Sequence, residues 1–454
     1  MSKSKSFEKN LSEGSVLKQL LIFSLPFLLS NIIQSLYNVA DMFIVGNFAG
    51  TVSMSGVNIG GQITLILTNF VVGLCTGGTV LIAQYIGSKD KEAMEESVAT
   101  LMTILFIASI ALTAIMLIFK TPLLHLINTP AESFQESSNY LTITVIGIIF
   151  IFAYNVFSAI MRGMGDSRRP FIYVLIACIT NIGLDLILVA GFKMGATGAA
   201  IATVVSQALS VILCIISMIK NGFVFDFKPS SFKLHADKVK KILMIGLPSA
   251  VQNGVVSLSF LIITALVNTI GGVNASAAVG VVGKFNGFAI MPGVAMGVSI
   301  STIAAQNIGA NKWHRAIHTC KLGTLIAVAI SYTIFALVQM FPESILRIFN
   351  DDAEMIHYGV TYIRSFSFDY LLVPICFCIN GLFIANGHTT FSLINGLLSS
   401  ILLRVPASYL FGSILGMGIF GVGVGAPIAS AGSLILILGY LISGKWKTNL
   451  IKEL

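Results

Sequence analysis

Charged residues are scarce in this chain of 454 residues. Only 10% are Asp, Glu, Lys or Arg, whereas 56% are hydrophobic, and the mean hydropathy is +0.91. A soluble protein of this length cannot bury so much apolar surface, so lipid must surround most of the chain. The net charge of +8 then describes loops at a membrane face, and no nucleic-acid partner is expected.

Cysteine patterns and enzyme motifs are also lacking. The six cysteines lie in or beside apolar runs, without the spacing of a disulfide framework or a zinc site. No H-E-x-x-H, G-x-S-x-G or P-loop sequence occurs, and His314 and His318 have no acid beside them. We therefore expect no enzyme, no structural metal and no bound cofactor. The polar amino terminus has no apolar core of a signal peptide, so none is expected.

What the chain does have is an internal repeat with an offset of 222 residues. The register holds without a gap from Pro26 to Gly87, and Gly165 later maps to Gly387. Matched pairs include Leu25-Pro26 with Leu247-Pro248, Asn31 with Asn253, Gly50 with Gly272, and Ala83-Gln84 with Ala305-Gln306. Repeated halves in a membrane protein are typical of secondary transporters. A duplicated scaffold without cargo is the alternative.

Apolar runs of transmembrane length predict twelve spans. They lie near 17–46, 54–82, 94–119, 138–162, 171–192, 195–219, 241–268, 276–305, 316–340, 357–384, 390–412 and 417–443. The expected fold is an all-α integral membrane protein with two six-helix bundles related by a parallel repeat. The amino-terminal lobe would cover 1–219, a cytoplasmic linker 220–240, and the carboxyl-terminal lobe 241–454.

The distribution of Lys and Arg predicts the orientation. Of the 27 such residues, 21 fall in the two tails and the loops on one side, and only Lys120, Lys193 and Arg347 fall opposite. The positive-inside rule then places both termini in the cytoplasm of a multi-pass cell-membrane protein. The linker, with six Lys and several Phe, could bind anionic lipid headgroups or could simply contribute to this bias.

Acidic side chains deep in the first lobe are the main candidate site. From a rise of about 1.5 Å per residue, Asp41 and Asp185 lie roughly 8 and 9 Å below the outer surface. Asn181 is one turn deeper on the face of Asp185, and Thr203 is at roughly 12 Å. Away from the span ends, no Lys or Arg lies in a predicted span of this lobe to compensate the charge of the two acids. They would share a proton or bind a hard cation such as Na⁺, or else be separate structural acids.

The second lobe differs, because Ile263 and Ala407 stand where the repeat would place the two acids. Its spans contain Lys284, Arg364, Asp369 and Arg404 instead. These residues could form a structural ion pair between Lys284 and Asp369, or they could contact an anionic group of a substrate.

Prolines occupy equivalent positions in spans 1 and 7, at Pro26 and Pro248. Proline removes an intrahelical hydrogen bond and can kink a helix, so these positions could be moving hinges. Membrane helices also tolerate proline without moving. Glycines at 418, 421, 423 and 425 should let the last span pack closely against its neighbours.

The loop after span 4 carries a family resemblance. Its sequence Arg162-Gly163-Met164-Gly165-Asp166-Ser167-Arg168-Arg169-Pro170 resembles the "RGxGD(T/S)RxP" motif of multidrug and toxic compound extrusion (MATE) transporters. Asp41, the Ala83-Gln84-x-x-Gly87 end of span 2 and the Leu-Pro start of spans 1 and 7 are similar to the same family. The resemblance covers essentially the whole chain.

This resemblance implies an antiporter that exchanges H⁺ or Na⁺ for drug-like organic compounds by alternating access. It also implies an ion site formed by Asp41, Asn181, Asp185 and Thr203, the set already reached by depth. Some members use acids in spans 7 and 10 instead, but here span 7 has only Gln252 and Asn253. The alternative is a flippase for a lipid-linked cell-wall precursor. A monomer suffices for either function, and the sequence does not choose among substrates.

Overall fold

The computed structural model describes residues 7–225, 227–348 and 352–453, and these residues form helices and connecting turns without strands. Nine helical segments in them are long and apolar enough to cross a membrane, or eleven when each of two bent pairs counts as one span. The helices of the first half are α1 (Val16–Ser88), α2 (Lys91–Leu126), α3 (Ala131–Ile146), α4 (Ile148–Gly163), α5 (Arg168–Asp185), η1 (Leu186–Gly191) and α6 (Gly195–Lys220).

The second half repeats this order after the short η2 (Pro229–Ser231). Its helices are α7 (Ala236–Ala289), α8 (Met291–Gly309), α9 (Trp313–Met340), α10 (Pro342–Arg347), α11 (Ala353–Phe366), α12 (Asp369–Ala385), α13 (Thr389–Leu397), η3 (Leu398–Arg404), α14 (Val405–Tyr409), η4 (Leu410–Ile414), α15 (Gly418–Ile442), η5 (Lys445–Lys447) and α16 (Leu450–Glu453). Pairs α3–α4 and α11–α12, bent by 50° and 49°, correspond to spans 4 and 10.

The first helical segment holds two spans. At about 1.5 Å per residue, its 73 residues would measure roughly 110 Å, far more than one bilayer. Gly50 breaks the helix with φ 81° and ψ 178°, and its repeat partner Gly272 breaks α7 with φ 64°. Positive φ values favour glycine, because it has no Cβ to clash with the backbone. With this break, the twelve predicted spans and the all-helical, two-bundle fold are confirmed.

The chain forms two compact units, and each borrows a segment from the opposite half of the sequence. One unit contains residues 7–10 and 25–246, and the other contains 11–24 and 247–453. Both crossings come one residue before a predicted hinge proline: the first before Leu25-Pro26 in α1, the second before Leu247-Pro248 in α7.

Hydrogen bonds and an ion pair anchor the borrowed segments. In the second unit, the Leu11 N–H donates to Gln306 Oε1 at 2.9 Å, and Arg315 donates to the Gly14 carbonyl at 2.8 Å. In the first unit, Lys238 lies 3.2 Å from Glu96. Each unit is therefore completed by the segment that precedes a proline in the opposite half of the sequence.

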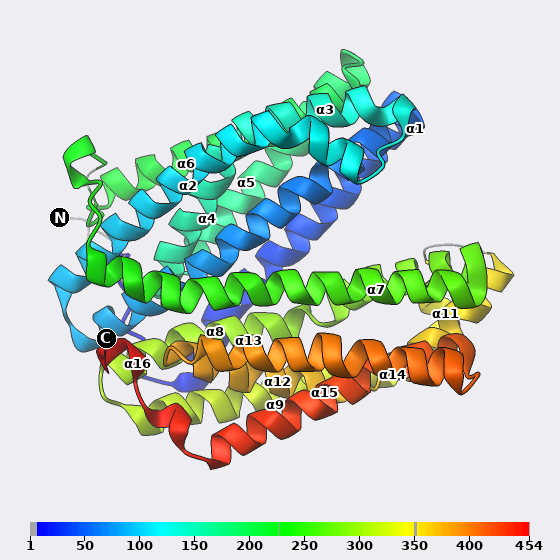
Figure 1. The fold of residues 1–454 in the computed structure, drawn as a ribbon. Helices are drawn as coiled ribbons and strands as arrows, with labels where there is room; N and C mark the ends of the chain where they lie inside the picture. Colours follow the sequence, from blue (N-terminus) through cyan, green and yellow to red (C-terminus); the bar gives the residue numbers. More distant parts are fainter. Residues whose placement is uncertain (1–6, 226, 349–351, 454) are drawn as a thin grey trace. The chain divides into compact units, whose positions relative to one another are not determined.

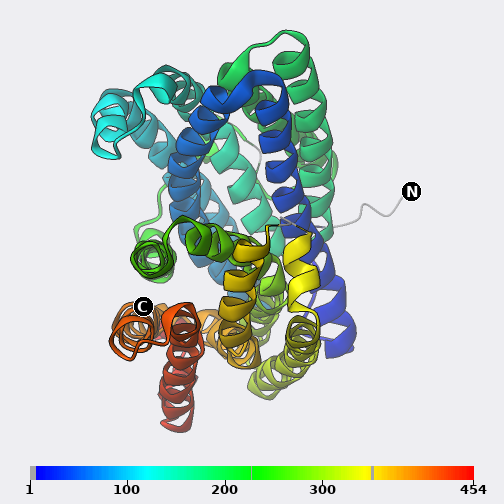
Figure 2. The same cartoon turned by 90° about the vertical axis from the view of Figure 1, so that its right-hand side faces the viewer.

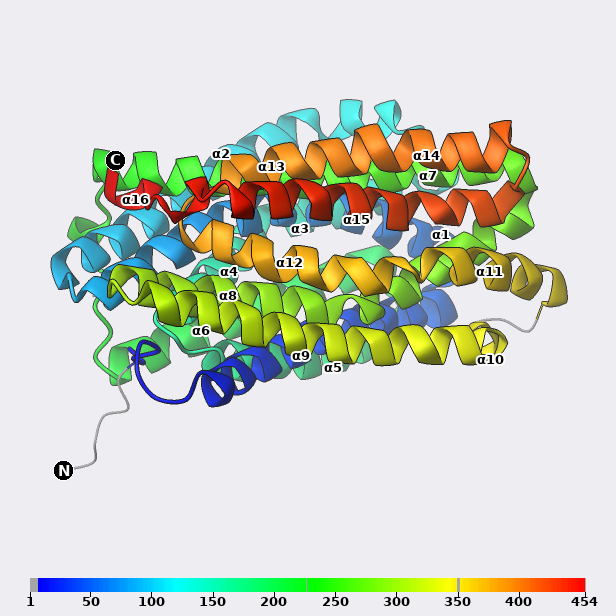
Figure 3. The same cartoon turned by 90° about the horizontal axis from the view of Figure 1, so that it is seen from below.

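Within each unit, the helices pack side by side. In the first unit, α6 contacts α3, α4 and α5, whereas in the second unit α12 contacts α8, α9 and α15. Figure 1 shows the elements in chain order, and Figure 3 shows α8, α9 and α12 lying alongside one another. Figure 2 views α7 and several other helices of the second unit nearly along their axes.

Close packing of α15 depends on its glycines, as predicted. A Cβ at Gly421 would overlap the backbone of Phe411, and one at Gly425 would lie 2.8 Å from the Arg404 carbonyl. Gly418 differs, because nothing lies within 4 Å of its Cβ position and its φ is +59°.

Replacing Gly421 with alanine is expected to lower the stability of the detergent-solubilised protein by about 1 kcal/mol or more, because α15 must move off its neighbour. Gly439→Ala is the matched control on the same helix, since nothing lies within 4 Å of its Cβ position. Thermal unfolding curves should show a lower midpoint for Gly421→Ala only. If Gly421→Ala unfolded at the same midpoint as wild type, α15 would be shown to accommodate the added methyl group without loss of stability.

Candidate functional site

The four polar residues predicted in the first lobe lie together in the structure. Asp41 comes from α1, Asn181 and Asp185 from α5, and Thr203 from α6. With its amide turned so that both ends are satisfied, Asn181 donates to Asp185 Oδ2 at 3.1 Å and accepts from the Thr203 N–H at 3.3 Å. The carboxyl groups of Asp41 and Asp185 are within hydrogen-bonding reach of each other.

This cluster is buried and short of partners. Asp41 is 7% exposed and Asp185 is fully buried, and the Oδ1 atom of each lacks a hydrogen-bond partner. Among the described residues, neither carboxyl forms an ion pair. Two ionised carboxylates are acceptors only, so a hydrogen bond between them requires a proton on one. A proton or a cation with oxygen ligands would satisfy the site.

Two tyrosines border the cluster, and the sequence analysis did not single them out. Tyr140, on α3, is 6% exposed and lies close to Thr203. Tyr37 lies on α1, near both acids. Its position four residues before Asp41 was a usable signal, because residues i and i+4 share a helical face. Tyr140 gave no such signal, because its position depends on the packing of α3 against α6.

A change in helix type follows the cluster directly. The α-helix of α5 ends at Asp185, and the next six residues form the π-helical turn η1. π-Helical turns are rare and often occur at functional sites, because they offset the side chains that follow from the regular helical path.

The motif loop between α4 and α5 is held by its own acid. Asp166 is 2% exposed and accepts from the Arg168 N–H at 3.0 Å. It also lies 2.9 Å from Lys9 and 3.3 Å from Arg169. These contacts join the loop to the amino-terminal segment.

Other motif residues have structural contacts. Gly165 has φ 88°, and its repeat partner Gly387 has φ 87°. A Cβ at Gly163 would lie 2.9 Å from the Thr79 carbonyl. The Pro170 carbonyl accepts from the Tyr154 hydroxyl at 3.1 Å, and the Arg162 guanidinium lies 5.4 Å from the centre of the Phe27 ring.

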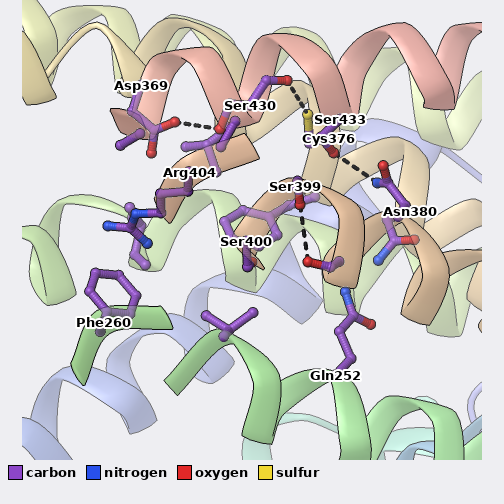
Figure 4. A pocket seen from close by; sticks show the side chains of 18 of the residues that line it. Gln252, Phe260, Asp369, Cys376, Asn380, Ser399, Ser400, Arg404, Ser430 and Ser433 are labelled. Atoms are coloured by element: carbon purple, nitrogen blue, oxygen red, sulfur yellow. Dashed lines mark hydrogen bonds between the residues drawn. The ribbon is translucent and has the colours of Figure 1, made fainter. Parts of the chain in front are cut away.

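Two of the four predicted charges in the second lobe lie in one cavity (Figure 4). Asp369, at the start of α12, and Arg404, at the end of η3, are each 8% exposed and line it. Lys284 and Arg364 are exposed and do not line this cavity. The structure therefore does not bring the four charges together, and a Lys284–Asp369 ion pair is absent among the described residues.

Metal-binding groups of the usual kind are not found in the described ranges: no cluster of three or more His, Cys, Asp or Glu could hold an ion. The first-lobe cluster contributes two carboxyl groups, one amide and one hydroxyl. These oxygen ligands suit H⁺ or a hard alkali cation better than a transition metal.

Comparisons with known proteins agree with the internal repeat. A family model described as MatE matches residues 26–187 and again residues 248–410, and the two matches begin 222 residues apart. The probable multidrug resistance protein YoeA of Bacillus subtilis (strain 168) is 29% identical over 450 residues, covering 98% of this chain and 97% of the relative.

A second relative is the probable multidrug resistance protein NorM of Thermotoga maritima. It is 25% identical over 452 residues, covering 96% of this chain and 94% of its own length. Among solved structures, an outward-facing multidrug resistance MATE family transporter of the MOP superfamily aligns with a TM-score of 0.91 at 22% identity. That alignment covers 97% of this chain and 98% of the other.

Proposed function

Since this chain belongs to the MATE family of multidrug efflux transporters, we propose that it exports drug-like amphipathic organic compounds in exchange for H⁺ or Na⁺. The coupling ion would bind in the first lobe at Asp41, Asn181, Asp185 and Thr203. The buried contact between two carboxyl groups without a cationic partner supports this assignment most strongly.

The proposed mechanism is alternating access driven by competition. In this mechanism an ion and a cationic drug compete for the carboxyl groups of Asp41 and Asp185, so binding of H⁺ or Na⁺ there weakens the hold on the drug and releases it. The ion can drive the conformational change only through a difference in its affinity for the two states. Pro26 and Pro248, beside the crossings between the compact units, are proposed as the bending points.

The proposed membrane arrangement places both termini in the cytoplasm and treats 220–240 as a cytoplasmic linker. The bias of Lys and Arg toward one set of loops supports it. The transporter would act as a monomer in the cell membrane, need no cofactor and catalyse no covalent chemistry. Several Lys and Phe of the linker suit contact with anionic lipid headgroups.

Wild-type protein reconstituted in liposomes is expected to move a fluorescent cationic dye when an inward H⁺ or Na⁺ gradient is imposed. Quenching of its fluorescence measures how much dye has crossed the liposome membrane. An ionophore that collapses the gradient should stop this movement. The gradient that supports transport identifies the coupling ion. Protein-free liposomes serve as the control.

Dye movement under neither gradient, from protein with a normal thermal unfolding curve, would contradict the antiport mechanism. It would favour the alternative, a flippase for a lipid-linked precursor. That function calls for several cations around a diphosphate, whereas Arg404 is the one cation that lines the described cavity of the second lobe.

A further inference from the structure

The cavity in the second lobe has the size and walls of a binding pocket. It is about 180 Å³ in volume and is lined by aromatic rings, including Phe260, Phe366 and Phe377, together with amide and hydroxyl groups. A cavity of about 150 Å³ can hold benzene. The space therefore accepts one substituted ring.

Arg404 brings a buried positive charge into this cavity (Figure 4). Its guanidinium stacks 3.9 Å from the centre of the Phe260 ring and lies 5.9 Å from that of Phe366. Tyr362 lies close to it. A guanidinium has five N–H donors in a planar fork that matches a carboxylate. The contact with Phe260 limits the movement of the guanidinium, and a group with five donors has some left for a ligand beside Tyr362.

Asp369 brings the opposite charge into the same space. Its carboxylate accepts from the Ser430 hydroxyl, as Figure 4 shows. Asn286, which also lines the cavity and is 6% exposed, has a buried Oδ1 atom without a hydrogen-bond partner. These acceptors are suited to an ammonium group, which carries three donors.

The two opposite charges do not form an ion pair with each other among the described residues, although both line the cavity. Arg404 and Asp369 attract each other across the cavity, but without direct contact this attraction offsets only part of the water that each buried group has lost. A molecule with both charges would compensate Arg404 and Asp369 together.

We propose that this cavity binds aromatic zwitterions, with their carboxylate on Arg404, their ammonium group on Asp369 and their ring against the phenylalanines. As an exported substrate class, such compounds depend on the proposed transport function. Binding itself does not, so it can be measured without any gradient. The site has no counterpart in the first lobe, where the repeat places Gly147 and Ile182 at the two charged positions.

Three probes that share a phenyl ring and a three-carbon chain but differ in their charged groups test the proposal: phenylalanine, its methyl ester at a pH that keeps the amine protonated, and 3-phenylpropionate. Binding to the full-length protein in lipid nanodiscs is measured by isothermal titration calorimetry. Wild type should bind phenylalanine about tenfold or more tightly than either singly charged probe, since charge-assisted hydrogen bonds are the strong ones.

Variants assign each charge to its partner. Arg404→Met should reduce affinity for phenylalanine and 3-phenylpropionate by about tenfold or more, but leave the methyl ester unchanged. Asp369→Asn should weaken phenylalanine and the methyl ester only. Arg364→Met is the matched control, because this arginine is exposed and lies outside the cavity.

Absent or charge-independent binding to wild type would overturn the proposal, as would unchanged phenylalanine affinity in folded Arg404→Met. If Arg404→Met fails to fold, Arg404→Lys keeps the charge but loses the fork, and it should still weaken 3-phenylpropionate. Equal affinity in Arg404→Lys would also overturn the proposal. Zwitterion binding without gradient-driven dye transport would contradict the proposed antiport alone, whereas dye transport without zwitterion binding would contradict only this inference.

Discussion

Replacing Asp41 with asparagine should abolish gradient-driven dye efflux. Asparagine keeps the shape of the side chain but carries no charge, so a cation loses one of two carboxylate partners in a buried site. Removing one partner from a buried charged pair costs on the order of 3 kcal/mol. At about 1.4 kcal/mol per tenfold, ion affinity should fall on the order of 100-fold. Efflux rates measured over a range of ion concentrations test this directly.

The matched control is Glu132→Gln, which makes the same chemical change at an exposed position in the same lobe. This variant should transport like wild type. Thermal unfolding in detergent checks that Asp41→Asn remains folded. Normal efflux from folded Asp41→Asn would show that coupling does not depend on this carboxyl group, and the proposed ion site would then be wrong.

Asp166→Ala is expected to cause the largest loss of stability. The substitution removes a buried carboxylate that lies 2.9 Å from Lys9 and 3.3 Å from Arg169 and accepts from the Arg168 N–H. Hydrogen bonds to charged groups contribute about 1.5–3 kcal/mol. The two cations are partly exposed and can regain water, so we expect the loss to stay within that range. Thermal unfolding should show a clear drop.

A second measurement separates this effect from general destabilisation. Without Asp166, the segment around Lys9 loses its ionic anchor, so trypsin should cut after Lys9 faster than in wild type. Glu95→Ala is the control, because its ion pair with Lys91 spans 3.8 Å between exposed side chains and contributes little. Unchanged stability and cleavage in Asp166→Ala would show that the loop holds its shape without the ionic contacts.

The sequence predicted the fold from its internal repeat, and it predicted that four polar residues of the first lobe lie together from their depth in the helices. An offset of 222 residues predicted two similar halves, and the family match repeats at the same offset. Depth counted at about 1.5 Å per residue brought Asp41, Asp185 and Thr203 to one level. Depth alone was enough to place the acids of the first lobe, because an acid in an apolar helix is expected to face the bundle interior.

The second lobe was harder to predict, because the depth of a residue along a helix does not say whether its side chain points into the bundle or away from it. Counted from the outer face at about 1.5 Å per residue, Lys284 and Arg404 both come out at about 12 Å. In the structure, however, Lys284 is exposed and Arg404 is buried against Phe260. Helices that are apolar on all sides do not reveal which face packs inward. The π-helical segment η3, which ends at Arg404, adds a further rotation that no composition signal predicts.

The exchange of helical turns at the two prolines has a consequence for the origin of the chain. Residues 11–24 complete the unit built from the second half, and 236–246 complete the unit built from the first. A half-length ancestor on its own would expose the surface that these segments cover, and its own amino-terminal segment would have no such surface to pack on. In a dimer of two copies, the amino-terminal segment of each copy could pack on the other copy, as in domain-swapped dimers. The present chain is thus organised as such a dimer whose two copies have become one polypeptide.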